Sequence, residues 1–375
     1  MSTALAVVGA VGLISWLGVL VHPARPWDLH PEGDDASPPE PSSWPNVSVL
    51  VPARDEAAVL PVTLPALLAQ DYPGRWRVVL VDDRSTDGTG DVARRHDSER
   101  LVVVEGCPLP AGWVGKVWAL EQGVVHAGDA EYLLLTDADI LHDPSNLREL
   151  VAESELQGLG LDSRMARLHA GSVVERLLVP PFAFFFALLY PMRWANDPRR
   201  RVAAAAGGCL LIRRSALAEI GGFAVIKGAV IDDIGLASAV KRLGRPIRLA
   251  SSRDRVRSVR AYPTLGGFWR TVRRTAFMQL RCSWLLLAGT TIALAVLFAA
   301  PPVLVVLGSS GIAGRWGLAF GGLAWVVATA VYLPTVRRYR LSPLWALTLP
   351  LAGILYCAMT VDSAIRHVRD ARGVW

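Results

Sequence analysis

YLLLTDADI, at residues 132–140, is an apolar run that ends in two carboxylates, Asp137 and Asp139. Alternate residues of a strand point to the same face, so both carboxylates leave the end of a buried strand together. That end is the rim at which open α/β sheets bind their ligands. Magnesium prefers oxygen ligands and usually takes one or two carboxylates together with substrate phosphates. The stretch therefore predicts a metal site, with a helix cap or a solvated turn as the alternative.

Short β-branched runs alternate with helical stretches on both sides of this strand. The runs typical of buried strands are residues 47–52, 76–82, 101–105 and 132–137, followed by two shorter ones at 208–213 and 246–250. The stretches typical of helices are residues 56–70, 88–95, 115–127, 146–155 and 232–243. This alternation predicts an α/β domain whose mostly parallel sheet is flanked by helices on both faces.

Apolar stretches at both ends of the chain predict transmembrane helices. Residues 4–21 predict an uncleaved anchor, with a cleaved signal peptide as the alternative, because no Lys or Arg precedes them and no clear A-x-A site follows. Three more candidates are residues 285–307, 316–333 and 344–361. A Phe-rich stretch at residues 177–190, interrupted by Pro180-Pro181, is too short to span. It is either a core helix or a segment that dips into the membrane surface.

The net charge of +6 comes mostly from arginines clustered between Arg193 and Arg281. The richest basic cluster leads straight into an apolar segment, which favours the anionic inner leaflet over nucleic acid as its partner. By the positive-inside rule, these arginines place the preceding domain in the cytosol. Three full C-terminal spans would leave Arg366, Arg369 and Arg372 outside, so a re-entrant third segment is an alternative. The four cysteines are scattered without zinc-ligand spacing, which favours a reducing compartment.

Polar side chains also follow the first two predicted strands. The first strand runs into VPARDE at residues 51–56, and the second ends in DDRSTDGT at residues 82–89. Adjacent acids at a strand end can accept hydrogen bonds from a base or a ribose, although a turn with a helix cap would use the same residue types. The chain has no G-x-G-x-x-G after the first strand and no P-loop motif, which argues against NAD, FAD and P-loop nucleotides.

In their order and spacing these motifs resemble the family 2 glycosyltransferases, which have the nucleotide-sugar-binding GT-A fold. The resemblance covers roughly Val47 to Trp284 and rests on VLVPARDE at 49–56, VDDRSTDGT at 81–89, GK at 115–116, TDAD at 136–139, AGGCLLIR at 206–213, IGGF at 220–223 and IDDIGL at 231–236. More narrowly, the chain is similar to the hopene-associated glycosyltransferases of bacteria. The stretches that carry this narrower similarity are ERLLVPPF at 175–182, LYP at 189–191, NDP at 196–198, IDD at 231–233 and RTAFMQLR at 274–281.

The resemblance implies a membrane-bound, metal-dependent, inverting glycosyltransferase that moves a sugar from a nucleotide-sugar donor to a lipid hydroxyl, hopanoid- or polyprenyl-related. The residues it implies for the nucleotide sugar are Pro52, Arg54, Glu56, Asp82, Asp83, Lys116 and Asp137. Asp139, supported by Asp137, is implied to place Mg²⁺ or Mn²⁺ on the diphosphate. Lys116 is implied to add a second positive charge there, and a solvated lysine at a helix start is the alternative.

The catalytic base implied by the family pattern is Asp233, with Asp232 in place of the family's usual Glu; a helix N-cap pair is the alternative. On the acceptor side the implied residues are Gly207, Gly208, Gln279, Arg281 and Trp284. Processive polysaccharide synthases of the family carry Gln-x-x-Arg-Trp, and the broken spacing here favours a single transfer. Interfacial anchoring of the following helix is the alternative role for the last three residues. A processive synthase and a catalytically silent scaffold of hopanoid synthesis are the alternative functions.

The predicted organisation is a transmembrane anchor at 1–22, a Pro-rich linker at 23–45, a GT-A domain at 46–284, two or three transmembrane segments at 285–362 and a basic tail at 363–375. The expected location is the bacterial inner membrane, multi-pass, with the catalytic domain in the cytosol. The expected partners are a nucleotide-sugar donor, a lipid acceptor and membrane lipids, and no nucleic acid is expected.

Overall fold

A computed structural model describes residues 2–29, 38–252 and 254–372, with side chains described up to residue 369. Part of the predicted linker, residues 30–37, and the last three residues of the predicted tail lie outside the described residues. The chain divides into two compact units. We call them the helical unit, made of Met1–Leu29, Ala170–Pro191 and Ala261–Trp375, and the α/β unit, made of His30–His169 and Met192–Arg260.

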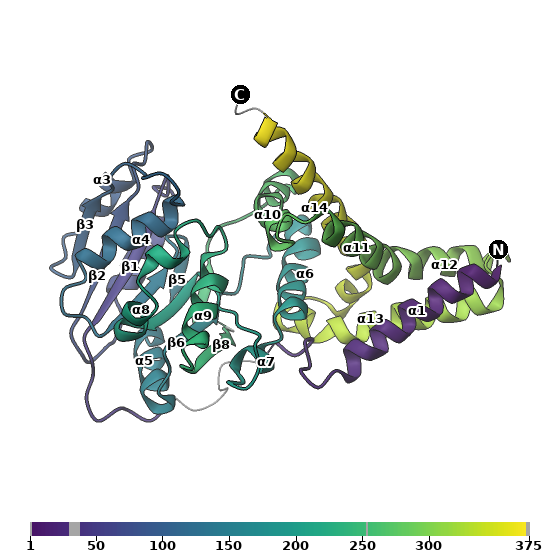
Figure 1. The fold of residues 1–375 in the computed structure, drawn as a ribbon, viewed down its shortest axis with the longest axis horizontal. Coiled ribbons are helices and arrows are strands. Elements are labelled where there is room, and N and C mark those ends of the chain that lie inside the picture. Colours follow the sequence, from purple (N-terminus) through teal and green to yellow (C-terminus); the bar gives the residue numbers. More distant parts are fainter. Residues whose placement is uncertain (1, 30–37, 253, 373–375) are drawn as a thin grey trace. The chain divides into compact units, whose positions relative to one another are not determined.

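The α/β unit is built on a sheet of seven strands in the order β3-β2-β1-β4-β7-β6-β8 (Figure 1). Its strands are β1 (Val47–Ala53), β2 (Trp76–Asp82), β3 (Leu101–Glu105), β4 (Tyr132–Thr136), β6 (Leu161–Met165), β7 (Cys209–Arg213) and β8 (Ile247–Ser251). Neighbouring strands are parallel, except that β7 runs antiparallel to both β4 and β6. The mostly parallel sheet predicted from the sequence is therefore confirmed.

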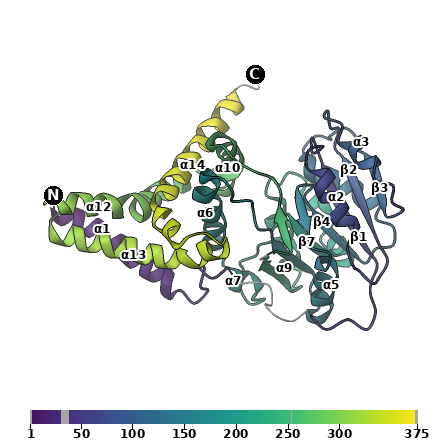
Figure 2. The same ribbon diagram turned by 180° about the vertical axis from the view of Figure 1, so that it is seen from behind.

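Helices cover both faces of this sheet. They are α2 (Leu60–Leu68), α3 (Thr89–Arg94), α4 (Gly115–Val125), α5 (Asn146–Gln157), α7 (Met192–Asn196), α8 (Arg214–Glu219), α9 (Asp232–Arg242) and the 3₁₀ helix η1 (Phe223–Ile226). Leu50 of β1 is buried with Leu120 of α4 on one face. Val49, its neighbour in the strand, is buried with Leu64 of α2 and Leu150 of α5 on the other face (Figure 2). Both sides of the strand are therefore apolar, as in a covered parallel sheet.

A two-stranded ribbon lies beside the end of β4. It pairs β5 (Ile140–His142) with β9 (Val256–Ser258) in antiparallel orientation, and Ile140 lies opposite Ser258. Because β5 begins directly after Asp139, this pairing carries β9 to the carboxylates that end β4. The backbone N–H of Val259 donates to the Asp139 carbonyl at 2.9 Å.

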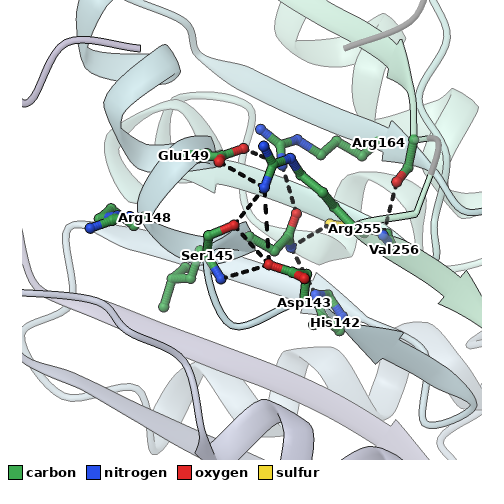
Figure 3. Close-up of polar contacts among 12 residues, drawn as sticks. His142, Asp143, Ser145, Arg148, Glu149, Arg164, Arg255 and Val256 are labelled. Carbon is green, nitrogen blue, oxygen red and sulfur yellow. Dashed lines mark hydrogen bonds and ion pairs between the residues drawn. The ribbon is translucent and has the colours of Figure 1, made fainter. Parts of the chain in front are cut away.

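A cluster of charged side chains joins this ribbon to the start of α5 (Figure 3). The Arg255 guanidinium, just before β9, lies 2.6 Å from the Ser145 hydroxyl and 2.8 Å from the Glu149 carboxylate. Glu149 is also 3.6 Å from the buried Arg164 of β6. Asp143 accepts hydrogen bonds from the backbone N–H and the hydroxyl of Ser145. These contacts attach the ribbon to the main sheet and to α5.

The helical unit contains the apolar segments. Its elements are α1 (Ser2–Val21), α6 (Val173–Leu189), α10 (Leu265–Gln279), α11 (Trp284–Leu294), the π-helical η2 (Ala295–Ala299), α12 (Ala300–Ser309), α13 (Gly314–Arg338), the 3₁₀ helix η3 (Pro343–Thr348) and α14 (Leu349–Arg372). By length and composition, four helical stretches of the described chain are apolar enough to cross a membrane: Ser2–Val21, Trp284–Ser309, Gly314–Arg338 and Pro343–Arg369. In both ribbon views α1, α12 and α13 lie side by side (Figures 1 and 2).

The Phe-rich stretch lies mostly in one helix, α6, which continues through Pro180-Pro181. A capping box between Ser172 and Glu175 begins the helix. Phe184 is fully buried against Trp16 and Tyr332 of the helical unit. Of the two alternatives left open by the sequence, the structure shows a packed helix in the core of this unit.

Other boundaries also differ from the prediction. The helix expected from residue 56 begins at Leu60, because the preceding residues form a turn closed by the bond from the Val59 N–H to the Glu56 carbonyl. The strands β5, β6 and β9 were not predicted.

Candidate active site

The loops that follow β1 and β2 are tied together. The Asp55 carboxylate accepts the backbone N–H of Thr86 at 2.8 Å, and the Glu56 N–H donates to the Thr89 hydroxyl at 2.8 Å. Asp55 has a φ of 54°, a left-handed conformation that Asp adopts more readily than most residues. The two polar stretches predicted to hold a nucleoside therefore form one continuous surface in the α/β unit.

Asp83 lies on this surface with Arg54 beside it. The Arg54 guanidinium is 3.6 Å from the Asp83 carboxylate. Burial raises the pKa of Asp83, and the Arg54 charge opposes that rise. A Cβ at Gly115 would lie 3.0 Å from this carboxylate, so the start of α4 approaches Asp83 closely because residue 115 is glycine. Asp82 points elsewhere and accepts the backbone N–H of Ser85 at 3.1 Å.

Lys116, the second residue of α4, joins two of the predicted carboxylate motifs. Its ammonium nitrogen lies 2.8 Å from Asp137 Oδ1 and 3.3 Å from Asp232 Oδ2. Burial alone would lower the pKa of Lys116, but the two carboxylates raise it above its usual value. The side chain is therefore protonated at neutral pH. Burial raises the pKa of Asp137, and the Lys116 charge opposes that rise. The lysine therefore pairs with both acids, and its side chain is 31% exposed.

Asp233 lines a small pocket together with Lys116 and Asp232. Pro52, Thr136 and Phe223 also line this pocket. The backbone N–H of Gly207 donates to Asp233 Oδ2 at 2.8 Å. Desolvation first, and then the neighbouring Asp232 charge, raise the pKa of Asp233 to about 6. A carboxylate with such a pKa is ionised at neutral pH and still able to accept a proton.

Asp139 is held from the ribbon side of the site. Its Oδ2 accepts hydrogen bonds from the Ser258 hydroxyl at 3.0 Å and from Arg260 Nε at 2.9 Å. Arg260 also contacts the Glu56 carboxylate through Nη2. Burial raises the pKa of Glu56, and Arg260 opposes that rise. Arg260 therefore joins the loop after β1 to the acid after β4.

Comparison with known proteins shows the family to which the chain belongs. A family model described as "glycosyltransferase like family 2" matches residues 45–277, more than half of the chain. The chain belongs to glycosyltransferase family 2. The probable glycosyltransferase YdaM of Bacillus subtilis is 31% identical to this glycosyltransferase over 219 residues. The match covers 54% of this chain and 48% of that protein.

A second relative is the dodecaprenyl-phosphate galacturonate synthase of Rhizobium johnstonii, 30% identical over 117 residues, 31% of this chain and 34% of that protein. The glycosyltransferase thus spans about half the length, or less, of these two relatives. Among solved structures, the mannosyltransferase PcManGT from Pyrobaculum calidifontis in complex with GDP-Man and Mn²⁺ has a TM-score of 0.61 at 22% identity, covering 96% of this chain and 99% of that one. At this identity the likeness shows the fold alone, and the GT-A fold expected from the sequence is confirmed.

The two acids that end β4 in this glycosyltransferase are suited to hold a divalent cation together with a substrate diphosphate. Each gives one oxygen to a basic side chain: Asp137 Oδ1 to Lys116, and Asp139 Oδ2 to Arg260. The other oxygens, Asp137 Oδ2 and Asp139 Oδ1, have no hydrogen-bond partner among the described residues. No group of three metal-ligating side chains occurs in the described part of the chain. Two carboxylates with phosphate oxygens match the usual ligand set of Mg²⁺.

The residues expected on the acceptor side divide between the units. Gly207 lies in the pocket, where an added Cβ would come 3.1 Å from the Lys116 nitrogen. The carbonyl of Gly208 accepts the Thr136 hydroxyl at 2.8 Å. Gln279 and Trp284 belong to the helical unit, where Gln279 contacts the Tyr190 hydroxyl and Trp284 packs on Phe277. Arg281, also in this unit, is exposed and has a φ of 53°.

Two residues of the site, Ser258 and Arg260, were not predicted from the sequence. Both lie in the Arg-rich stretch whose charge was assigned to membrane lipids. No alternation of apolar and polar residues marks this stretch, but Ser258 and Arg260 are two residues apart, so on an extended segment their side chains point to the same face.

Proposed function

We propose that this glycosyltransferase is a membrane-bound, metal-dependent, inverting enzyme that moves a sugar from a nucleotide donor to a lipid hydroxyl. The observation that carries the proposal is the position of Lys116, which lines one pocket with Asp232 and Asp233 and also pairs with Asp137 after β4. A charge clamp for a diphosphate and a base for a hydroxyl are the two groups that an inverting transfer needs.

Donor binding is assigned to the surface formed by the loops after β1 and β2. Asp83, kept close to Arg54, is positioned to accept hydrogen bonds from the nucleoside, with Asp82 as the alternative. Pro52, near the end of β1, and Glu56, in the loop that follows, are assigned to the same donor site. Lys116 supplies a fixed positive charge for the diphosphate. A preorganised charge of this kind stabilises the negative charge that grows on a departing phosphate.

Asp137 and Asp139 would hold Mg²⁺ or Mn²⁺. Such an ion, when bound, supplies Lewis-acid stabilisation of the departing diphosphate. The arrangement of free oxygens described above supports this assignment, as does the presence of Mn²⁺ with GDP-Man in the PcManGT structure. Ser258 and Arg260 keep Asp139 in a single orientation through its other oxygen.

Asp233 is the proposed general base. The acceptor hydroxyl has a pKa far above 7, so it becomes a competent nucleophile only as its proton is taken. The hydroxyl oxygen bonds to the anomeric carbon while its proton passes to Asp233 and the bond to the diphosphate breaks on the opposite face. The Gly207 N–H orients the carboxylate for this role. One displacement through an oxocarbenium-like transition state inverts the anomeric carbon.

The lipid acceptor and the membrane location are supported by the four apolar helices and by similarity to a dodecaprenyl-phosphate galacturonate synthase. We propose a multi-pass protein of the bacterial inner membrane with its α/β unit in the cytosol. Gly207, Gly208, Gln279, Arg281 and Trp284 are the proposed acceptor-side residues. The sequence similarity to hopene-associated glycosyltransferases favours a hopanoid- or polyprenyl-related acceptor.

The test is sugar transfer from radiolabelled nucleotide sugars in membranes of an expressing strain. The parent should label a lipid with one sugar, and Asp233→Asn should lower the rate by roughly 10²–10⁴-fold, the usual contribution of a positioned base. Asp129→Asn, at an exposed site, is the matched control and should label like the parent. The parent rate should rise with pH through about 6, because Asp233 accepts a proton only after losing its own.

Three outcomes contradict this proposal. Labelling of no lipid by any donor, with metal-dependent nucleotide binding retained, would assign the chain as a scaffold. Long products would assign a processive synthase. An Asp233→Asn variant that labels as fast as the parent would remove Asp233 as the base.

A further inference from the structure

A second, strongly basic pocket lies in the helical unit between α10 and α14. It has a volume of about 370 Å³. Arg270, Arg273 and Arg274 line it from α10, and Arg366 and His367 line it from α14. The two helices lie next to each other in both ribbon views (Figures 1 and 2). Nothing in the proposed transfer reaction uses this pocket.

Specific hydrogen bonds hold the two helices together beside the pocket. The Trp269 indole N–H donates to the Asp362 carboxylate at 2.7 Å, and Arg273 lies 3.3 Å from the same carboxylate. The Ser363 hydroxyl donates to the Arg273 carbonyl at 2.5 Å and accepts the Phe277 N–H at 3.1 Å. The walls of the pocket are therefore fixed relative to each other before any ligand binds.

The charge of this pocket is poorly compensated within the protein. Asp362 pairs with Arg273 and also interacts electrostatically with Arg366. In the part of the chain whose side chains are described, Arg270 and Arg274 contact no carboxylate. They are one helical turn apart, so their like charges repel each other. Such a cluster in a preformed pocket is stabilised by an anion that takes hydrogen bonds from several guanidinium groups.

The pocket also lies where polar and apolar parts of the helical unit meet. Phe277 and Met278 form part of its lining, and Phe277 is buried with Leu287 of α11 and Ala364 of α14. The apolar stretch Trp284–Ser309 begins five residues after α10 ends, and the stretch Pro343–Arg369 ends beside the pocket. If these stretches lie in a bilayer, the pocket is at the depth of the lipid phosphates.

From these observations we propose that the pocket between α10 and α14 binds the phosphate head group of an acidic membrane phospholipid. The guanidinium groups donate hydrogen bonds to the phosphate oxygens, and Met278 contacts the glycerol and the start of the acyl chains. The bound lipid joins the helix that follows the α/β unit to the C-terminal helix. The inference rests on the membrane placement made in the proposed function, and it is independent of the transfer reaction.

An acidic phospholipid fits this pocket better than a polynucleotide does. A nucleic acid site would present exposed aromatic rings for base stacking along a basic groove. Here the aromatic ring of Phe277 is buried. Trp284, which packs on it, is exposed, but it begins an apolar helix, α11, and not a basic groove. Arginine also suits phosphate, because its planar group donates two parallel hydrogen bonds.

The experiment is lipid retention by the purified full-length chain. Membranes are solubilised in a mild non-ionic detergent that carries added phosphatidylglycerol, and the protein is analysed by native mass spectrometry after detergent exchange. The parent should retain one phosphatidylglycerol. Arg270→Gln/Arg274→Gln should lose it, with at least a tenfold drop in the lipid-bound fraction. The matched control, Arg315→Gln/Arg337→Gln, removes two other exposed arginines of the helical unit and should retain the lipid.

Several results would overturn the inference. Equal retention by the pocket variant and the parent would exclude the pocket, and equal loss in both variants would assign the effect to overall charge. Displacement of phosphatidylglycerol by an equimolar polyprenyl phosphate would assign the pocket to an acceptor lipid instead. Recovery of the parent in the soluble fraction would refute the membrane placement itself, which separates failure of that premise from failure of the pocket.

Discussion

Arg260 neutralises two acids that come from different loops of the site. It contacts Asp139 through Nε and Glu56 through Nη2, and burial of this guanidinium is offset by those two charges, which together raise its pKa. Ser258 adds one neutral hydrogen bond to the same oxygen of Asp139. An acid held through one oxygen presents the other in a fixed direction, which is what a metal ligand requires.

We expect the loss of Arg260 to weaken the proposed metal site more than the loss of Ser258. Substituting a residue that orients a metal ligand usually lowers metal affinity by about 10–100-fold. Arg260→Met should fall in this range when Mn²⁺ binding is measured by electron paramagnetic resonance without donor. Ser258→Ala should lower the Mn²⁺ affinity by a smaller factor, because it removes a single neutral hydrogen bond. Unchanged Mn²⁺ affinity in Arg260→Met would show that Asp139 is not oriented through Arg260, or is not a ligand.

At the scale of elements, the sequence predicted the strands whose centres are apolar. β2 and β3 were predicted with their exact ends, because Val and Leu make up their central residues. β6 was missed because its centre is Asp162-Ser163-Arg164, three buried polar residues whose partners are far away in the chain. Burial of those side chains depends on tertiary contacts, so no local sequence pattern predicts a strand there.

The same limit applied to the site. The acids after β1, β2 and β4 were predicted because parallel strands bring their carboxyl ends to one rim. The contact of Lys116 with both Asp137 and Asp232 depends on how α4 and α9 pack, which spacing alone does not reveal. Arg260 reaches the site only through the β5–β9 ribbon, a pairing of two three-residue strands.

The β5–β9 ribbon contains a buried histidine, His142, that makes the free energy of unfolding of the protein depend on pH. His142 lies 2.8 Å from both the Thr136 hydroxyl and the Asn146 amide, and burial, followed by the nearby Arg164 charge, lowers its pKa to about 3. The folded state therefore keeps the ring neutral while the unfolded chain takes up a proton below about pH 6.5. The contribution of the neutral ring to the free energy of unfolding is fully present above that pH. It decreases as the pH falls, by about 2 kcal/mol at pH 5.

The measurement is thermal unfolding of the full chain in detergent at pH 7.5 and pH 5, for the parent and for His142→Gln. The variant lacks the titrating ring, so the stability advantage of the parent should shrink at pH 5. Asp162, whose pKa burial raises to about 6, acts in the opposite direction but equally in both proteins, so it cancels in the comparison. A constant difference between parent and variant at both pH values would contradict the prediction.

At the scale of the whole molecule, the contacts of α14 within the helical unit bear on the topology question that the C-terminal arginines raise. Leu347 of η3 accepts the indole N–H of Trp325 in α13, and Gly353 lies against Phe298 between α11 and α12. Further along α14, Ser363 bonds to α10. The last segment thus returns toward the helix that follows the α/β unit, which supports the re-entrant alternative for its topology.

Cysteine labelling tests this topology. In three variants with one cysteine each, native Cys107, Ser310→Cys and Arg369→Cys, an impermeant maleimide should label only position 310 in intact spheroplasts. Positions 107 and 369 should react only after permeabilisation, because the C-terminal end of α14 stays on the side of the α/β unit. Labelling of position 369 from outside would instead establish a third full span.

The assembly of the helical unit from three distant pieces of chain has a consequence for biosynthesis. α1 is made first, yet a Cβ at its Gly9 would touch Leu304 and Phe320, residues made about three hundred positions later. Until those helices exist, Trp16 and Phe184 lack the cover that Phe298 and Tyr332 provide. A ribosome that stops at Arg260 would release every strand of the sheet together with α1 and α6, which would lack these packing partners. Cells would be expected to degrade such a fragment, so the two units cannot be separated by a simple truncation.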